Sequence, residues 1–162
     1  MNNLLEKIKV DVYDKLGLEP LNFQVEAESK EYDACRFELN RRKIICRSAK
    51  ITPKKVGQFV TFWKRNGIGP IEPFQENDAI DYFVVNLRSG DEIGQFVFPK
   101  SILIKKGIIS TEQKEGKRAF RVYPKWDFPK SKQAERTQKW QLEYFYEVHD
   151  SIDTSTVLEL YR

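Results

Sequence analysis

Two acidic residues, Glu31 and Asp33, and one lysine, Lys50, have side chains that suit phosphoryl chemistry. Two carboxylates on neighbouring strands can hold Mg²⁺, which activates water, and a nearby lysine can stabilise the negative charge that develops on phosphate. Ser48, two residues before the lysine, is a poor Mg²⁺ ligand on its own. Glu31, Asp33 and Lys50 are therefore the candidate catalytic residues, with Glu31 and Asp33 as the candidate metal ligands. A nuclease would need Mg²⁺, and for any other function we expect no cofactor.

A β-hairpin can bring these residues together. Residues 32–39 and 43–50 predict two strands, and we take Asn40-Arg41 as the two-residue turn between them, although arginine is not an ideal turn residue. Phe37 then faces Ile44, which is a favourable apolar pair. The same register places three further pairs opposite one another: Cys35 and Cys46, Asp33 and Ser48, and Glu31 and Lys50. The side chains of all four pairs lie on one face of the hairpin. The Glu31–Lys50 pair also suits an ordinary salt bridge.

The segment after the hairpin is basic and predicts a helix over residues 53–65. Thr52 suits the N-cap position and Pro53 the first helical position. Apolar residues recur at helical spacing, at Val56, Phe59, Val60 and Trp63. The N-terminus of a helix favours anions. We therefore expect four basic residues here to contact phosphate: Arg47, Lys50, Lys54 and Lys55.

Basic residues are concentrated in two blocks. Residues 36–65 hold ten Lys and Arg with a single acid, Glu38, and residues 100–140 hold twelve with four acids. The net charge is only +4, so the separation of charge, more than its total, favours a polyanionic partner. A solvated surface is the alternative interpretation.

In the second block, basic residues alternate with aromatic ones. Lysine and arginine can bind phosphate, and aromatic rings can stack on unpaired bases. Residues 131–148 predict a helix, on which basic residues fall along one face. The expected nucleic-acid contacts in this half are Arg118, Arg121, Lys125, Trp126, Lys132 and Arg136.

The remaining patterns complete an α+β domain over residues 1–162. Residues 2–17 predict an amphipathic helix, with Asn2 or Asn3 as its cap and Gly17 as its end. Further strands are expected at 21–28, 80–88, 93–103 and 119–124, and a short helix at 152–161. We expect a single domain with a central mixed sheet and helices. Its α-β-β-β-α-β order resembles the core of the PD-(D/E)xK nuclease superfamily.

The composition indicates in which cellular compartment we expect the protein and which metal sites are disfavoured. There is no run of 18 apolar residues and no signal-peptide core, so we expect a cytoplasmic protein without membrane insertion. Two facing thiols in a reducing compartment are usually small buried apolar groups, with a redox switch as the alternative. His149 is the only histidine and is remote from the cysteines, which disfavours a zinc site.

Several stretches together resemble the MepB-like protein family. They cover residues 28–37, 47–65, 94–109, 116–127 and 132–141. The family takes its name from a multidrug-efflux operon that also encodes a regulator and a transporter. Many members have glutamate at the position of Ser48, which would complete a Glu-x-Lys motif. The serine in this chain argues against metal-dependent cleavage and leaves nucleic-acid binding unaffected.

The sequence thus favours a protein that binds DNA or RNA and has a degenerate nuclease-like core. The first alternative is an active Mg²⁺-dependent nuclease that uses Glu31, Asp33 and Lys50. The second is a module that binds an acidic protein or a small anion. Sequence does not distinguish DNA from RNA, and it identifies no protein partner.

Overall fold

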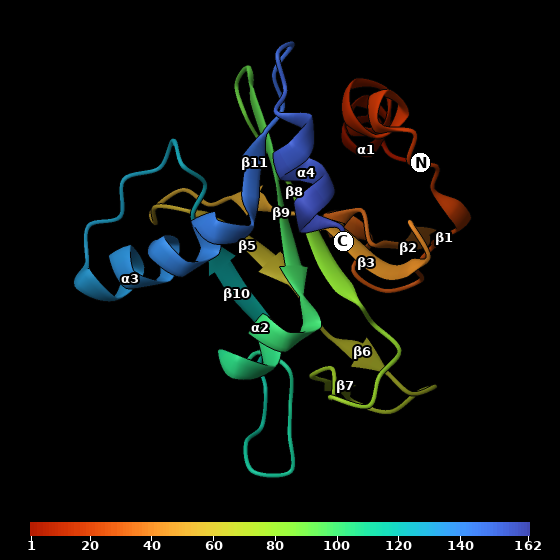
Figure 1. Ribbon diagram of the computed structural model, residues 1–162. Coiled ribbons are helices and arrows are strands. Elements are labelled where there is room, and N and C mark those ends of the chain that lie inside the picture. The colour runs from red at the N-terminus through yellow and green to blue at the C-terminus, as the bar shows by residue number, and fades with distance from the viewer.

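Six segments rich in β-branched and aromatic residues form a central mixed sheet in the computed structural model, which describes residues 1–162 (Figure 1). The strand order is β1-β2-β3-β8-β9-β11. Strands β3 and β8 run parallel, and all other neighbours run antiparallel. In that order the bounds are Leu21–Val25, Cys35–Leu39, Arg42–Ser48, Tyr82–Ser89, Glu92–Pro99 and Phe145–Glu147.

Both faces of the central sheet are covered, so β8 carries an almost unbroken apolar run. On one face, α1 (Asn3–Ile8), its continuation through Leu16 and α4 (Thr154–Leu160) pack on side chains such as Val84. On the other face, Phe83 packs with α2 (Lys100–Lys105) and with a small second sheet. The α+β class, the mixed sheet and the helices are thus confirmed. None of the helices combines the length and apolar composition needed to cross a membrane.

The small sheet replaces the helix that was expected over residues 53–65, and that prediction is wrong. Its strands are β4 (Lys50–Ile51), β5 (Gln58–Thr61) and β10 (Ala119–Val122), in the order β10-β5-β4. Burial alternates along β5, as a strand requires, and Gly57 before it has a positive φ of 84°. The apolar spacing fits a helix, but β5 pairs with β10, a strand that is remote in sequence. Two short strands, β6 (Lys64–Arg65) and β7 (Ile71–Glu72), follow as a separate pair.

Helix α3 (Lys132–Gln141) is shorter than the predicted 131–148. It is capped by Ser131 and followed by a 3-10 turn and β11, where aromatic residues join the edge of β9. The side chain of Gln141 is fully buried. Its amide accepts a hydrogen bond from the Tyr123 N–H (2.8 Å) and donates one to the Arg121 carbonyl (3.0 Å). Gln141 thus occupies part of the edge of β10 and fixes α3 beside it.

The hairpin between β2 and β3 has the predicted register but ends earlier than expected. Cys35 faces Cys46 and Phe37 faces Ile44, as predicted. The pairs Asp33–Ser48 and Glu31–Lys50 do not form, because β2 begins at Cys35. The residues before it form η3 (Lys30–Tyr32), a 3-10 turn that reverses the chain between β1 and β2.

The turn itself gives a test of the fold. Asn40 and Arg41 have positive φ values of 51° and 64°. A residue with a Cβ atom loses roughly 1–2 kcal/mol of stability in this left-handed conformation, and glycine does not. Part of this advantage is offset because glycine loses more conformational entropy on folding. We expect Arg41→Gly to raise the free energy of unfolding by about 0.5–1 kcal/mol in urea denaturation. Arg42→Gly, one residue into β3, is the matched control and should lower it. Destabilisation by both changes would contradict the turn.

Candidate nucleic-acid interface

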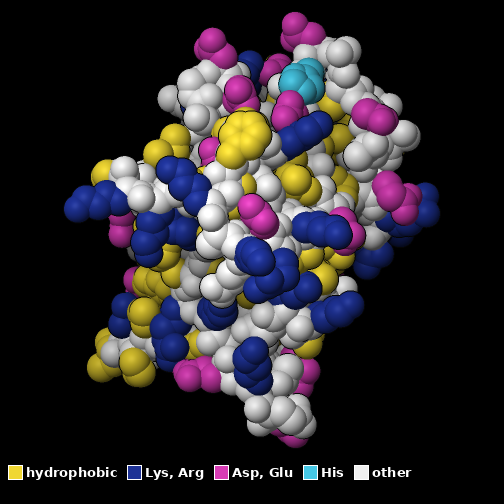
Figure 2. Space-filling model, turned by 90° about the vertical axis from the view of Figure 1, so that its left-hand side faces the viewer, with side chains coloured by type: hydrophobic (Ala, Val, Ile, Leu, Met, Phe, Trp, Pro, Cys, Tyr) yellow, Lys and Arg dark blue, Asp and Glu magenta, His cyan; other side chains and the backbone are white.

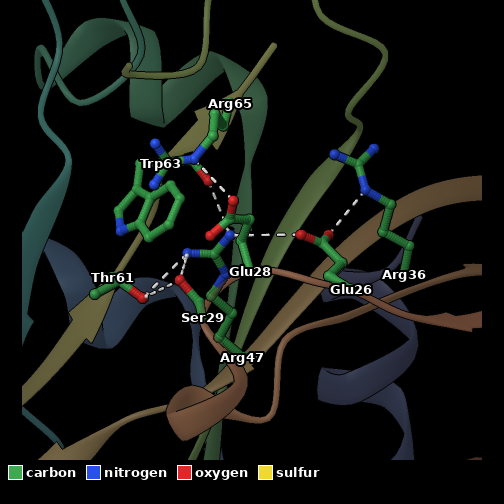
Figure 3. Close-up of polar contacts among 8 residues, drawn as sticks. All are labelled: Glu26, Glu28, Ser29, Arg36, Arg47, Thr61, Trp63 and Arg65. Carbon is green, nitrogen blue, oxygen red and sulfur yellow. Dashed lines mark hydrogen bonds and ion pairs between the residues drawn. The ribbon is translucent and has the colours of Figure 1, made fainter. Parts of the chain in front are cut away.

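Arg47 was expected to contact phosphate, but its side chain has no solvent exposure. Its guanidinium donates to Ser29 Oγ (3.2 Å), Thr61 Oγ1 (3.1 Å) and the Trp63 carbonyl (3.0 Å), as Figure 3 shows. Glu26 lies 3.6 Å away as an ion-pair partner. Burial lowers the pKa of Arg47, and the charge of Glu26 opposes that shift. Arg47 therefore holds β3 against β5, and the prediction of a phosphate contact is wrong.

Four of the ten cations in the first basic block are paired with carboxylates within the fold: Arg36, Arg47, Lys64 and Arg65. Arg36 pairs with Glu26 at 2.8 Å, and Arg65 pairs with Glu28 at the same distance (Figure 3). Lys64 pairs with Asp78 at 2.9 Å. These carboxylates lie outside the block in sequence, so a local charge count overstates the positive surface. Lys50, Lys54 and Lys55 remain exposed on β4 and on the loop that follows it.

The candidate metal ligands do not form a site. Glu31 and Asp33 are exposed on the turn before β2, and neither forms an ion pair with Lys50. The Lys50 ammonium lies instead 4.8 Å from the centre of the Tyr32 ring. No group of three or more His, Cys, Asp or Glu side chains is placed to hold a metal ion. The residues present therefore do not fit a Mg²⁺ site.

Arg121 does face the surface, but it also organises the loop before β5. On β10 it is the cross-strand neighbour of Phe59 on β5, and Phe59 is the cross-strand neighbour of Lys50 on β4. The three residues therefore form one row across the small sheet. The Arg121 guanidinium lies 5.8 Å from the Phe59 ring centre and donates to Thr52 Oγ1 at 2.6 Å. Thr52, expected to cap a helix, is thus an acceptor that holds the loop carrying Lys54 in place.

A groove of about 340 Å³ lies between α3 and β10. Its lining includes three basic residues, Lys106, Lys117 and Arg121, and no acidic residue. We call it the basic groove. Tyr123 and Trp140 also line it, and the Lys106 ammonium lies 5.4 Å from the centre of the Trp140 ring. The sequence placed Lys106 and Lys117 in the second basic block but did not single them out.

The basic groove is bounded by α3, and the side of the molecule that carries α3 is rich in cations. Figure 2 looks onto the side of the molecule that carries α3, where Lys and Arg side chains spread across the middle with a few acidic ones among them, and further acidic ones lie at the top and bottom. Several of the cations on and beside α3 have no carboxylate within 4.0 Å: Lys106, Lys117, Lys132, Arg136 and Lys139. The expected contacts Lys132 and Arg136 are thus exposed and unpaired on α3, although neither of them lines the groove.

The other expected contacts are positioned differently. Arg118 is exposed but pairs with Glu115 at 3.1 Å. Lys125 is exposed, whereas the neighbouring Trp126 is half-buried and packs edge-on against Phe145, with ring centres 5.8 Å apart. Trp126 therefore does not offer an open ring face of the kind expected for base stacking.

Comparison with known proteins gives a family and a close structural relative. A protein-family model described as MepB-like matches residues 26–147. The chain is similar to a crystal structure of MepB, with 32% identity over 92% of this chain and 99% of that chain and a TM-score of 0.80. It also aligns with a bacterial homing endonuclease at 17% identity over 86% of each chain, but the TM-score of 0.44 does not establish a common fold. No curated protein matches the sequence significantly.

The role of Arg47 can be separated from that of a surface cation. We expect Arg47→Met to lower the free energy of unfolding by about 3 kcal/mol, because it leaves the buried acceptors without a donor. Arg36→Met removes the other, exposed partner of Glu26 and should cost less than about 1 kcal/mol. Urea denaturation of both variants measures the difference. Equal losses of unfolding free energy in the two variants would show that the burial of Arg47 does not increase its contribution to stability.

Proposed function

The chain belongs to the MepB-like family, and we propose that it binds nucleic acid through the basic groove. One observation carries the proposal: three cations line a concave surface that has no acid in its lining. Phosphate contacts supply most of the affinity in sequence-independent binding, and they require cations that are not already neutralised by the protein. Lys106 and Lys117 meet that requirement.

Helix α3 adds to the attraction for phosphate. Ser131, Gln133 and Ala134 at its N-terminal end line the groove, so the positive end of the helix dipole lies beside the cations. Lys132, Arg136 and Lys139 extend the positive charge along the exposed side of the helix. A backbone that follows α3 can therefore meet several cations in succession.

The groove also offers surface for bases. Tyr123 and Trp140 are half-buried and line it, and aromatic rings stack on unpaired bases whatever their sequence. This combination of cations and rings favours nucleic acid over a small anion or an acidic protein as the ligand. Mg²⁺-dependent cleavage is not part of the proposal.

We also place the protein in the cytoplasm. Cys35 and Cys46 face one another on β2 and β3, and both are free thiols. Both side chains are buried, and two facing buried thiols are typical small apolar core groups of proteins in a reducing compartment.

The test is the salt dependence of oligonucleotide binding. Fluorescence anisotropy with single-stranded DNA, RNA and duplex DNA should show binding at about 50 mM salt that weakens steeply as salt rises. The double variant Lys106→Ala/Lys117→Ala should lower the slope of log affinity against log salt by about 1.4 for single strands and about 1.8 for duplex DNA.

A charge-matched control excludes a general effect of net charge. Lys15 and Lys43 are exposed, lack carboxylate partners and lie outside the groove lining. The variant Lys15→Ala/Lys43→Ala should leave the slope nearly unchanged. Equal effects of both double variants, or no binding at low salt, would contradict the proposal. Full competition by inorganic phosphate at low concentration would indicate a small-anion site instead.

A further inference from the structure

Three aromatic side chains line the basic groove, and only one of them has a ring without a partner. Phe120 is 9% exposed and packs in the core against Phe98. The Trp140 ring contacts Phe98, with ring centres 5.6 Å apart, and the Lys106 ammonium. Tyr123 contacts neither another ring nor a cation in this way. Its ring is therefore the one in the groove that is free to receive a ligand.

The Tyr123 ring extends from the end of β10 into the groove. Tyr123 follows the last residue of β10, and both it and Arg121, two residues earlier, line the groove. Its hydroxyl makes no hydrogen bond within the protein and is nevertheless not buried. The hydroxyl end of the ring therefore reaches the solvent in the groove.

Two contacts hold Tyr123 in this position before any ligand binds. Its N–H donates to the side chain of Gln141 on α3 at 2.8 Å. Its ring lies against Gly57, where a Cβ atom would come within 2.7 Å of the ring carbons Cδ1 and Cε1. Gly57 also has a positive φ of 84°, a conformation that favours glycine. A ring that is fixed in advance loses little conformational entropy when a ligand stacks on it.

A free ring beside unpaired cations suits a nucleotide whose base is not paired. Bases in a duplex are stacked on one another, whereas the bases of a single strand can turn outward and stack on an aromatic side chain. The groove volume of about 340 Å³ lies at the lower end of the range for small-ligand pockets, which is room for about one nucleotide. Lys106, Lys117 and Arg121 in the same lining can meet the phosphates on either side of that nucleotide.

We propose that the ligand of the basic groove is a single strand and that Tyr123 stacks on one of its unpaired bases. The inference rests on the proposed function, because the cations of the groove must bind the phosphates of the same strand. Stacking depends little on which base is present, so single strands bind without a marked sequence preference. A duplex meets only the cations, so it binds less tightly than a single strand of the same length.

Three nucleic acids separate the ring from the cations. The first is a single-stranded deoxythymidylate of about 12 nucleotides, the second has the same length and backbone but only abasic sites, and the third is the first strand paired with its complement. Tyr123→Leu should weaken binding of the first by about 5- to 150-fold, the range expected for the loss of one stacked base, without changing its salt slope. Binding of the abasic strand should change much less, which shows in the same experiment that the variant is folded.

Two further variants complete the comparison. Tyr123→Phe keeps the ring and should restore the preference for the base-bearing strand that Tyr123→Leu loses. Tyr144→Leu removes a half-buried tyrosine outside the groove lining and should leave this preference unchanged. If Tyr123→Leu weakens the base-bearing and the abasic strand equally, the ring serves only to cover Gly57, and its role in binding is overturned.

The wild-type protein alone tests the class of ligand. Its affinity should be higher for the deoxythymidylate than for either the abasic strand or the duplex. Equal affinity for the base-bearing and abasic strands would overturn the stacking and leave the groove proposal standing. Binding of the duplex at least as tight as that of the single strand would overturn the single-strand class. Absence of binding to all three at low salt would overturn both proposals.

Discussion

The buried guanidinium of Arg47 is the constraint on which the arrangement of the two sheets depends. A charge removed from water must be surrounded by acceptors and an opposite charge, or the folded state loses several kcal/mol. Ser29 and Glu26 come from the connection between β1 and β2, while Thr61 and the Trp63 carbonyl come from β5 and the residues after it. Both segments must lie against β3 before the charge is satisfied. This requirement fixes the small sheet, and with it β10, against the central sheet.

The same pairing determines where positive charge remains available. Glu26 and Glu28 neutralise arginines that sequence places in the first basic block, and Asp78 does the same for Lys64. The second block lacks comparable partners around α3, where the cations stay free. The fold thus turns a modest net charge into a directional field, because part of the first block is paired internally, whereas the cations around α3 stay unpaired on one face.

Sequence patterns correctly predicted the elements that depend on neighbouring residues, and they failed for the elements that depend on residues distant in the chain. The N-terminal helix, with Asn2 as its cap, and the hairpin register both follow from adjacent residues, and both are confirmed. The helix over residues 53–65 is wrong because Val56, Phe59, Val60 and Trp63 fit a helical stripe equally well. Strand β5 forms because it pairs with β4 on one side and with the distant β10 on the other. The basic blocks were visible in sequence, but the choice of Lys106 and Lys117 required the fold.

Arg121 links the basic groove mechanically to the loop before β5. Its side chain lines the groove, and the same guanidinium donates to Thr52 Oγ1 and toward the carbonyls of Val56 and Gly57. A guanidinium has five N–H donors, so it can hold this loop and still meet a phosphate. A phosphate bound at Arg121 would therefore act on the loop that carries Lys54 and Lys55. Replacing Arg121 would disturb the groove and this loop together, which is why Lys106 and Lys117, and not Arg121, test the groove.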